Sequence, residues 1–394
     1  MRAPAFKCQK RSGFATGAAS SGTRAARAAQ SAAGNRLTRR NLSNWLESAM
    51  PSFSDAALAM CAFWIVAGPL LDKRIEEKVE WLSLSLGAFA LTASWSWSER
   101  VIIEALARAA SLGGALVAGA LFFSAVHAPL RRVVGRLCAR FGTRPAVAAT
   151  VALSGLAAPF VTAGVAVLLL VEVLAALPLE EGRRREAGVL GCCAVGLGSG
   201  LSSVGGPASA VLMSKVSGAA YPVGPGFLFS LVGAWLVPGL LGLAAGAAVL
   251  CGAADPAAKP RPEDPFSLWT LLVLTGRLFV FTAGLVLLGD ALTPLIERAF
   301  LGLHPAALYW ANALASVTDN AALVAVQVSP TMSQDQLRHA FLGVLTAGSA
   351  FLSGDPPNLV AAHKLGIPAR GWALVGVPAS AALMLFCFLS LAGL

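Results

Sequence analysis

Residues 311–330 read ANALASVTDNAALVAVQVSP and place Thr318, Asp319 and Asn320 in the middle of an otherwise apolar run. A charged side chain at the centre of a bilayer costs about 2.5 to 3.5 kcal/mol on insertion scales. A carboxylate at that depth therefore indicates a functional site and requires a partner elsewhere in the chain. We expect the partner in a second interrupted apolar segment.

That segment lies at residues 348–364, GSAFLSGDPPNLVAAHK, where Asp355, Pro356 and Pro357 interrupt the apolar run. Proline has no N–H group, so two in succession break a helix and leave carbonyl groups one turn earlier without partners. Open backbone at membrane depth is tolerated where it faces protein or a water-filled cavity, and its carbonyl groups can bind a cation. The plainer alternative is a proline kink in which Asp355 caps the helix that begins at Pro356.

The composition indicates an integral membrane protein. Of the 394 residues, 56% are hydrophobic and only 13% are charged, which excludes an ordinary soluble domain. The seven cysteines include no CxxC pair, so they predict neither a disulfide framework nor a zinc site. We expect the lipid bilayer as a partner, no cofactor and no nucleic acid.

The net charge of +10 comes from the N-terminus. Residues 1–46 hold nine Lys or Arg and no Asp or Glu, which leaves 21 basic against 20 acidic residues in the remainder. The segment is rich in Arg, Ser and Ala, as organelle transit peptides are. We predict that it is disordered and is removed on import to the plastid or the mitochondrial inner membrane, which leaves 47–394 as the membrane transport domain. The alternative is a basic tail on a bacterial inner-membrane protein.

The second half of the chain repeats motifs of the first. GGPASAVLMSK at 205–215 aligns with GDPPNLVAAHK at 354–364, so that Pro207 stands opposite Pro356. ALSGLAAP at 152–159 aligns with ALASVTDN at 313–320. Matches that occur in the same order predict an internal repeat.

We predict that the repeats cover about residues 101–251 and 266–394, joined by a linker at 252–265. If the segments 145–174 and 305–328 are re-entrant hairpins, each repeat crosses the membrane three times, and an odd number of crossings inverts the second repeat. Inverted repeats bring broken helices together near the membrane midplane. The expected fold is an all-α polytopic membrane protein with two inverted repeats, re-entrant hairpins and discontinuous helices.

Two further local features are expected from the first half. The hairpin is predicted to break around Ala158 and Pro159, because proline interrupts helices. The loops expected at 131–145 and 180–186 are rich in arginine. By the positive-inside rule, these loops lie toward the cytoplasm, stroma or matrix.

Four motifs resemble the sodium/proton antiporter family of the ion transporter superfamily. They are GLGSGLSSVGGPASAVLMSK at 196–215, RLFVFTAGLVLLGDALTP at 277–294, NALASVTDNAALVAVQVSP at 312–330 and GSAFLSGDPPNLVAAHKLGI at 348–367. The similarity covers about residues 109–391, and it implies secondary transport by inverted repeats whose hairpin tips meet two unwound helices. The sequence departs from the family pattern at Gly206, where an acid often precedes the proline, and at Ala322, where threonine is commoner.

The leading hypothesis is a secondary active transporter that exchanges sodium or another monovalent cation for protons. Asp319 and Asp355 are the expected ligands of the transported cation, because a buried carboxylate can hold a proton or a cation in turn. Hydroxyl and amide oxygens would complete the shell that hard cations prefer. The candidates are Thr318, Asn320, Ser353 and Asn358 in the second half and Ser202, Ser203 and Ser209 in the first. A homodimer is compatible with the sequence.

The alternative is a cation-coupled carrier of dicarboxylate, citrate or arsenite anions, which occur in the same superfamily. In that case Arg277, the clearest basic residue at membrane depth, supports the site and receives the anion together with helix N-termini. We expect no enzymatic activity, because the chain has neither a GxSxG nor an HExxH motif. The glycine-rich stretch 187–215 predicts no nucleotide site, since no strand precedes it.

Overall fold

The computed structural model describes residues 53–216, 222–251, 268–300, 303–315, 320–329 and 331–393. Within these ranges the chain forms helices and no strand, which confirms the expectation of an all-α protein. Residues 54–394 form one compact unit. The predicted targeting segment at 1–46 and the predicted linker at 252–265 lie outside the described residues.

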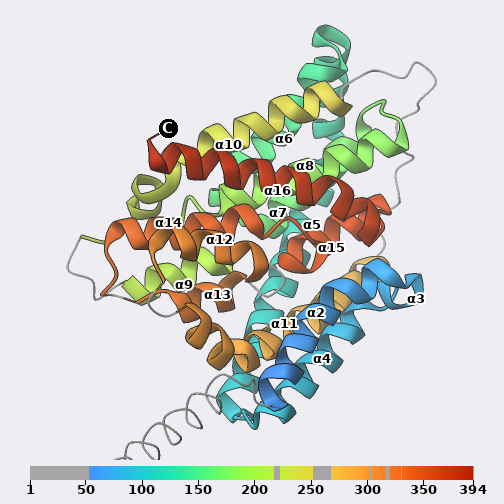
Figure 1. Ribbon diagram of the computed structural model, residues 1–394. Helices are drawn as coiled ribbons and strands as arrows, with labels where there is room; N and C mark the ends of the chain where they lie inside the picture. Colours follow the sequence, from blue (N-terminus) through green and yellow to red (C-terminus); the bar gives the residue numbers. More distant parts are fainter. Residues whose placement is uncertain are drawn as a thin grey trace, which may run out of the picture. The chain divides into compact units, whose positions relative to one another are not determined.

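The described helices follow one another along the chain (Figure 1). They are α2 (Phe53–Leu71), α3 (Lys73–Glu76), α4 (Val79–Ser94), α5 (Glu99–Phe141), α6 (Thr143–Val161), α7 (Ala163–Ala176), α8 (Glu181–Ser199), α9 (Pro207–Lys215), α10 (Phe227–Cys251), α11 (Leu268–Phe300), α12 (Pro305–Ala315), α13 (Asn320–Gln327), α14 (Gln334–Ala347), α15 (Pro356–Leu365) and α16 (Ala369–Ala392), with a short 3-10 turn, η2 (Leu352–Gly354), before α15.

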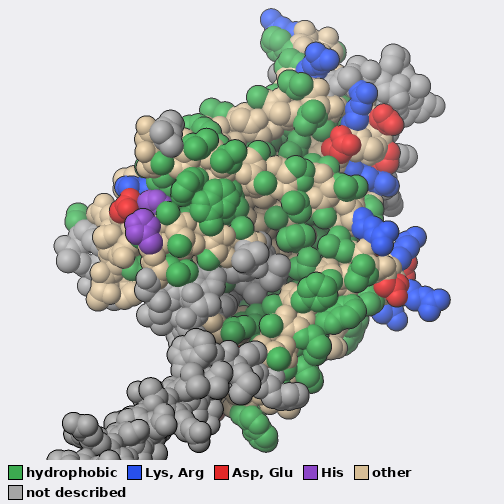
Figure 2. Space-filling model, viewed as in Figure 1, with side chains coloured by type: hydrophobic (Ala, Val, Ile, Leu, Met, Phe, Trp, Pro, Cys, Tyr) green, Lys and Arg blue, Asp and Glu red, His purple; other side chains and the backbone are tan. Residues whose placement is uncertain are grey.

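Six apolar stretches in the described ranges are long enough to cross a membrane. They are Ser54–Leu71, Glu99–Ala118, Thr143–Val161, Phe227–Cys251, Leu271–Leu295 and Ala369–Ala392. A crossing requires about 20 apolar residues, so the protein is a membrane protein. On the face shown in Figure 2, charged side chains gather along the top and right edges and in a smaller group at the left, with hydrophobic and uncharged surface between them.

The prediction of a loop at 131–145 is wrong. Helix α5 runs without interruption for 43 residues, and only Gly142, with φ +86°, separates it from α6. Arginine is a good helix former, so a run of arginines does not end a helix. At 1.5 Å per residue α5 is about 65 Å long, roughly twice the thickness of the hydrocarbon core. The arginines therefore lie on the last turns of a helix that is longer than one upright crossing.

The predicted break around Ala158 and Pro159 is displaced by three residues. Pro159 lies inside α6, and the chain leaves helical geometry at Thr162, which has φ +74°. Positive φ is rare for a β-branched residue and requires support from the surroundings. Part of that support is a hydrogen bond from Ala163 N to Gly205 O at 2.8 Å. A contact between distant segments thus sets the position of this break.

The order of element types recurs in the two halves. A long helix (α5 or α11) precedes two shorter helices in succession (α6 and α7, or α12 and α13), and a helix followed by a break and a short helix comes next (α8 and α9, or α14 and α15). The packing is reciprocal, because α9 of the first half contacts α13 of the second, and α15 of the second half contacts α7 of the first. Each short helix after a break therefore lies against the other half.

Glycines allow two helix crossings at backbone contact. A Cβ built on Gly198 of α8 would lie 1.9 Å from Gly155 O of α6, and a Cβ on Gly87 of α4 would lie 2.5 Å from Gly284 O of α11. Real side chains do not approach backbone so closely, so only glycine fits at these positions. The glycine-rich stretch at 187–215 thus packs helices closely, as small residues commonly do in membrane proteins.

Candidate functional site

A small cavity lies where the breaks of the two halves meet. Its volume is about 20 Å³. Since a water molecule requires roughly 10 to 15 Å³ by this measure, the cavity has room for one water molecule or one unhydrated ion of similar size. It is lined by Ala163, Gly196, Ser199, Gly206, Pro207 and Ala208 from the first half and by Asn320, Ala321, Leu345, Ser349 and Asp355 from the second.

The first-half wall is formed by the end of α8 and the start of α9. Proline suits the first turn of α9, because its missing N–H group would have no partner there. Ser209 Oγ donates to Ser199 O at 2.7 Å across the break. Ser202 Oγ donates to Pro159 O at 2.5 Å and so connects the break to the end of α6. The hydroxyl groups of this wall are thus used to hold the backbone in place.

The second-half wall contains the only charged side chain in the described lining, Asp355. Asp355 is partly buried and directly precedes α15, with extended backbone at φ −146°. Its side chain makes no capping hydrogen bond to α15. A simple helix cap, the plainer alternative from the sequence, is therefore not what the structure shows.

Among the buried oxygens that have no hydrogen-bond partner in the described residues, two belong to the second-half segments at the breaks. They are Oδ1 of Asn320, the first residue of α13, and Oγ of Ser353, just before Asp355. The Asn320 side chain lies against Gly348, because a Cβ built there would be 2.2 Å from its Nδ2. A buried polar atom without a partner costs roughly 1 to 3 kcal/mol, so these oxygens call for an explanation such as a bound ion.

The family model described as Protein of unknown function (DUF1646) matches residues 55–394. The chain belongs to this family. No curated protein matches the chain. The matched range begins in α2 and includes both breaks, so the cavity lies wholly within the part of the chain that defines its membership of the DUF1646 family.

The structure brings together several of the residues that the sequence singled out. Asn320 and Asp355 line the cavity, and the breaks around it contain Ser202, Ser209, Ser353 and Asn358. Asn358 Nδ2 donates to Phe351 O at 3.3 Å, across the turn that leads into α15. Ser203 is exposed and is not part of the lining. Thr318 and Asp319 lie outside the described residues.

Arg277 is not brought to the cavity. Its Nε donates to Glu80 Oε1 at 2.9 Å, and its Nη2 donates to Glu77 O at 2.8 Å. Glu80 is buried on α4, so the pair joins α4 to α11 and neutralises a charge that would be costly alone. The described geometry therefore gives Arg277 a structural partner, and the lining of the cavity does not include it.

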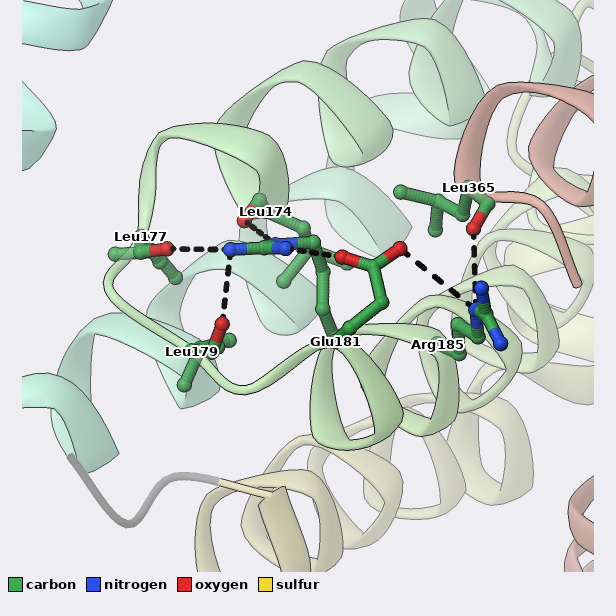
Figure 3. A network of polar contacts seen from close by, with 7 residues as sticks. Leu174, Leu177, Leu179, Glu181, Arg185 and Leu365 are labelled. Atoms are coloured by element: carbon green, nitrogen blue, oxygen red, sulfur yellow. Dashed lines mark hydrogen bonds and ion pairs between the residues drawn. The ribbon is translucent and has the colours of Figure 1, made fainter. Parts of the chain in front are cut away.

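A network of polar contacts holds α7, α8 and α15, which frame the cavity (Figure 3). The buried Arg184 donates to the carbonyl oxygens of Leu174, Leu177 and Leu179 and pairs with Glu181 at 2.6 Å. It thereby supplies partners to carbonyl groups at the end of α7 and in the turn before α8. Its neighbour on α8, Arg185, donates to the last residue of α15, Leu365, at 3.4 Å. The prediction of a loop at 180–186 is therefore wrong for residues 181–186, which form the first turns of α8, and two of their arginines connect α8 to its neighbours.

A pair of buried amides on α12 and α13 was not expected from the sequence. Gln327 Nε2 donates to Asn312 Oδ1 at 2.6 Å, and Asn312 Nδ2 donates to Ala340 O at 3.0 Å. These bonds connect α13, α12 and α14. Ser199 and Ser349, which line the cavity, were also overlooked, although both lie inside motifs quoted above. A serine in an apolar helix usually bonds to its own backbone, so the type alone carries little signal.

The lining combines hydroxyl, amide and carboxylate oxygens with helix ends of both polarities. Helices α8 and α14 end near the cavity, while α9, α13 and α15 begin there. Oxygen ligands suit a hard cation, whereas helix N-termini carry partial positive charge and favour an anion. The described lining contains one carboxylate, that of Asp355, and no Lys or Arg. The balance of charge therefore favours a cation.

Proposed function

We propose that the protein is a secondary active transporter that exchanges sodium, or another monovalent cation, for protons. The observation that carries this proposal is the cavity at the two breaks, whose described lining contains the carboxylate of Asp355 and the side chain of Asn320, with its buried Oδ1 unpaired among the described residues. Its volume of about 20 Å³ suits one unhydrated ion and excludes a larger substrate in this conformation.

In the proposed mechanism one carboxylate holds a proton and a cation alternately. Burial favours the protonated form of a carboxylate, and a bound cation favours the ionised form, so binding of one ligand releases the other. Asp355, Asn320 and Ser353 would supply oxygens to the cation. Asp319, which directly precedes Asn320 in the sequence, is proposed as a second carboxylate.

The proposed architecture is a pair of inverted repeats with re-entrant hairpins at α6–α7 and α12–α13. The reciprocal packing of α9 on α13 and of α15 on α7 supports it, because a two-fold axis would generate that exchange. We place the protein in the inner membrane of a plastid or mitochondrion, or in that of a bacterium, on the basic N-terminal sequence. A homodimer is part of the proposal.

The competing function is a cation-coupled anion carrier. The N-termini of α9, α13 and α15 at one cavity favour it, because such ends bind anions. In that case Asp355 would hold the coupling cation and the anion would bind at the helix ends.

Proton flux in proteoliposomes distinguishes the two functions. Purified protein is reconstituted with an internal pH-sensitive dye, and sodium, lithium, potassium or calcium gradients are imposed in turn. Antiport predicts proton movement driven by a monovalent cation gradient alone, abolished by Asp319→Asn. Uptake of a labelled dicarboxylate, citrate or arsenite that requires a cation gradient would replace antiport by the carrier function. Full exchange by Asp319→Asn would contradict the role of that carboxylate.

A further inference from the structure

A second cavity is a groove between the last turns of α5, most of the length of α6 and the later turns of α7. Its volume is about 420 Å³. It is lined by Val133, Val134, Phe141, Pro145, Ala146, Ala149, Thr150, Leu153, Ser154, Ala157, Leu169 and Val173. Ten of these twelve residues are apolar. Thr150 Oγ1 donates to Ala146 O of its own helix at 2.7 Å. The groove therefore fits an apolar ligand.

The groove is open to the surroundings of the protein. Leu153 is 65% exposed, Phe141 58% and Val133 47%. The α6 wall belongs to Thr143–Val161, a stretch long and apolar enough to cross a membrane. Where that stretch faces lipid, large apolar side chains can line an open groove without the cost that water would impose. An occupant would enter from the bilayer.

The length of the groove matches one lipid chain in one leaflet. Along α6 the lining residues run from Pro145 to Ala157, which spans about 18 Å at 1.5 Å per residue. Half of a hydrocarbon core of about 30 Å is about 15 Å. The groove thus runs for about the depth of one leaflet.

Basic side chains lie along the α5 wall of the groove and at the junction of α5 with α6. Arg132, Arg136 and Arg140 recur every four residues on α5, and Arg144 follows on α6; all four are exposed. The guanidinium of Arg140 lies over the ring of Phe141, 5.4 Å from its centre, and Phe141 lines the groove. The sequence holds no Asp or Glu between Glu104 and Glu172. The charged side chains that α5 and α6 contribute around the groove are therefore all basic.

We propose that this groove binds an anionic phospholipid, with one acyl chain along α6 and the phosphate of the head group at Arg136, Arg140 and Arg144. Arginine matches phosphate in geometry and charge, and basic pockets between membrane helices are suited to anionic head groups. A second copy of the chain is disfavoured as the occupant, because a two-fold contact through this face would bring the same arginines together. The segment 1–46 is disfavoured because it carries nine basic residues and no acid.

Lipid binding to the full-length protein in detergent tests the proposal. The probes are dioleoyl phosphatidylglycerol and dioleoyl phosphatidylcholine, which share their chains and differ in head-group charge, and native mass spectrometry measures their binding. We expect one phosphatidylglycerol to bind at least about tenfold more tightly than phosphatidylcholine, from the attraction of several arginines for one phosphate. Equal binding of the two lipids would overturn the proposal.

Two variants separate the head-group end from the chain end. Arg136→Gln/Arg140→Gln/Arg144→Gln should abolish the preference for phosphatidylglycerol, while Lys73→Gln/Arg74→Gln/Lys78→Gln removes the same charge from exposed positions around α3 and should keep it. Ala149→Phe should fill the groove and weaken binding of both lipids, in contrast to Ala382→Phe on an exposed part of α16. The arginine variant changes only exposed side chains, so we expect it to fold. It therefore tests the head-group site even if Ala149→Phe does not fold.

The remaining outcomes count against the proposal. An unchanged preference in the folded arginine variant would place the head group elsewhere. A dimer of the wild-type protein that Ala149→Phe dissociates, with no preference between the lipids, would identify a second copy as the occupant.

Discussion

The two breaks that meet at the cavity have the same order of helices but differ in the hydrogen bonding and charge of their side chains. In the first, between α8 and α9, the side-chain oxygens of Ser199, Ser202 and Ser209 all donate to backbone carbonyl groups. In the second, between α14 and α15, Ser353 Oγ has no partner among the described residues and Asp355 contributes a charge. The two breaks thus share a geometry, and the second adds a carboxylate and a buried hydroxyl without a partner among the described residues. We infer that the first break supports the site and the second binds the ion.

The largest expected effect comes from removing the charge of the second break. Asp355→Asn keeps the shape of the side chain but cannot exchange a cation for a proton, so we expect cation-driven proton flux to fall to the level of protein-free liposomes. The side chain makes no capping bond that Asn would preserve. Proteoliposome flux from pH 6 to 9 measures the effect, with elution as a single species in gel filtration as the check on folding.

The matched control is Asp335→Asn. Asp335, like Asp355, lies at the N-terminal end of a helix in the second half. Its side chain, in the first turn of α14, is 61% exposed. We expect this variant to exchange ions as the wild type does. Full activity of Asp355→Asn beside it would refute the division of roles between the two breaks.

A pair of serine variants sharpens the comparison, because the two hydroxyl groups should matter for different properties. Ser209→Ala leaves the buried Ser199 carbonyl without its donor and should lower the free energy of unfolding by about 1 to 3 kcal/mol. Ser353→Ala removes a hydroxyl that has no partner in the described structure and should be nearly neutral for stability. It should instead raise the half-saturating sodium concentration severalfold, as expected for a lost oxygen ligand.

Thermal unfolding in detergent and the sodium dependence of flux measure these two effects on the same preparations. The expected pattern is a crossed one, in which each variant changes one property and leaves the other near wild type. If both variants mainly lowered stability, the unpaired Ser353 hydroxyl would have a structural role and the second break would resemble the first.

The comparison also shows which features the sequence could predict. The break before α15 was predictable, because Pro356 and Pro357 remove two N–H groups and have the same local effect in any fold. The break at Thr162 was not, because a positive φ at this β-branched residue is supported by the hydrogen bond from the next residue, Ala163, to Gly205, which lies 42 positions from Ala163 in the chain. Local chemistry fixes the first kind of feature and tertiary contacts fix the second.

The candidate site was predictable to a similar extent. A charge such as Asp355 in an apolar segment stands out, because its cost at membrane depth is large. Asn312 and Gln327 did not stand out. A neutral amide in an apolar helix can be stabilised by a hydrogen bond to a side chain on another helix, and the sequence does not show which residues will pair. Arg277 was noticed for its charge, but its partner Glu80 lies 197 positions away, so its contribution to packing α4 on α11 was hidden.

The smallest expected effect comes from making the first break resemble the second. Gly206 stands opposite Asp355 when Pro207 is aligned with Pro356. Its φ of −166° is extended and open to any residue, and a Cβ there would meet Ser199 Oγ at 3.3 Å, a side-chain atom that can rotate away. Gly206→Asp should therefore fold and add a carboxylate to the first-half wall of the cavity.

Two carboxylates at one small cavity disfavour the doubly ionised state, so one proton is retained to higher pH. We expect the half-maximal point of exchange in Gly206→Asp to move to more alkaline pH, with the maximal rate little changed. Gly224→Asp, at a glycine with open space around it and no place in the lining, should leave the profile unmoved. A shift in both variants would indicate a general effect of charge. A folded Gly206→Asp with the wild-type profile would show that the first break does not sense the exchanging carboxylate at all, and the ion would then be bound by the second half alone.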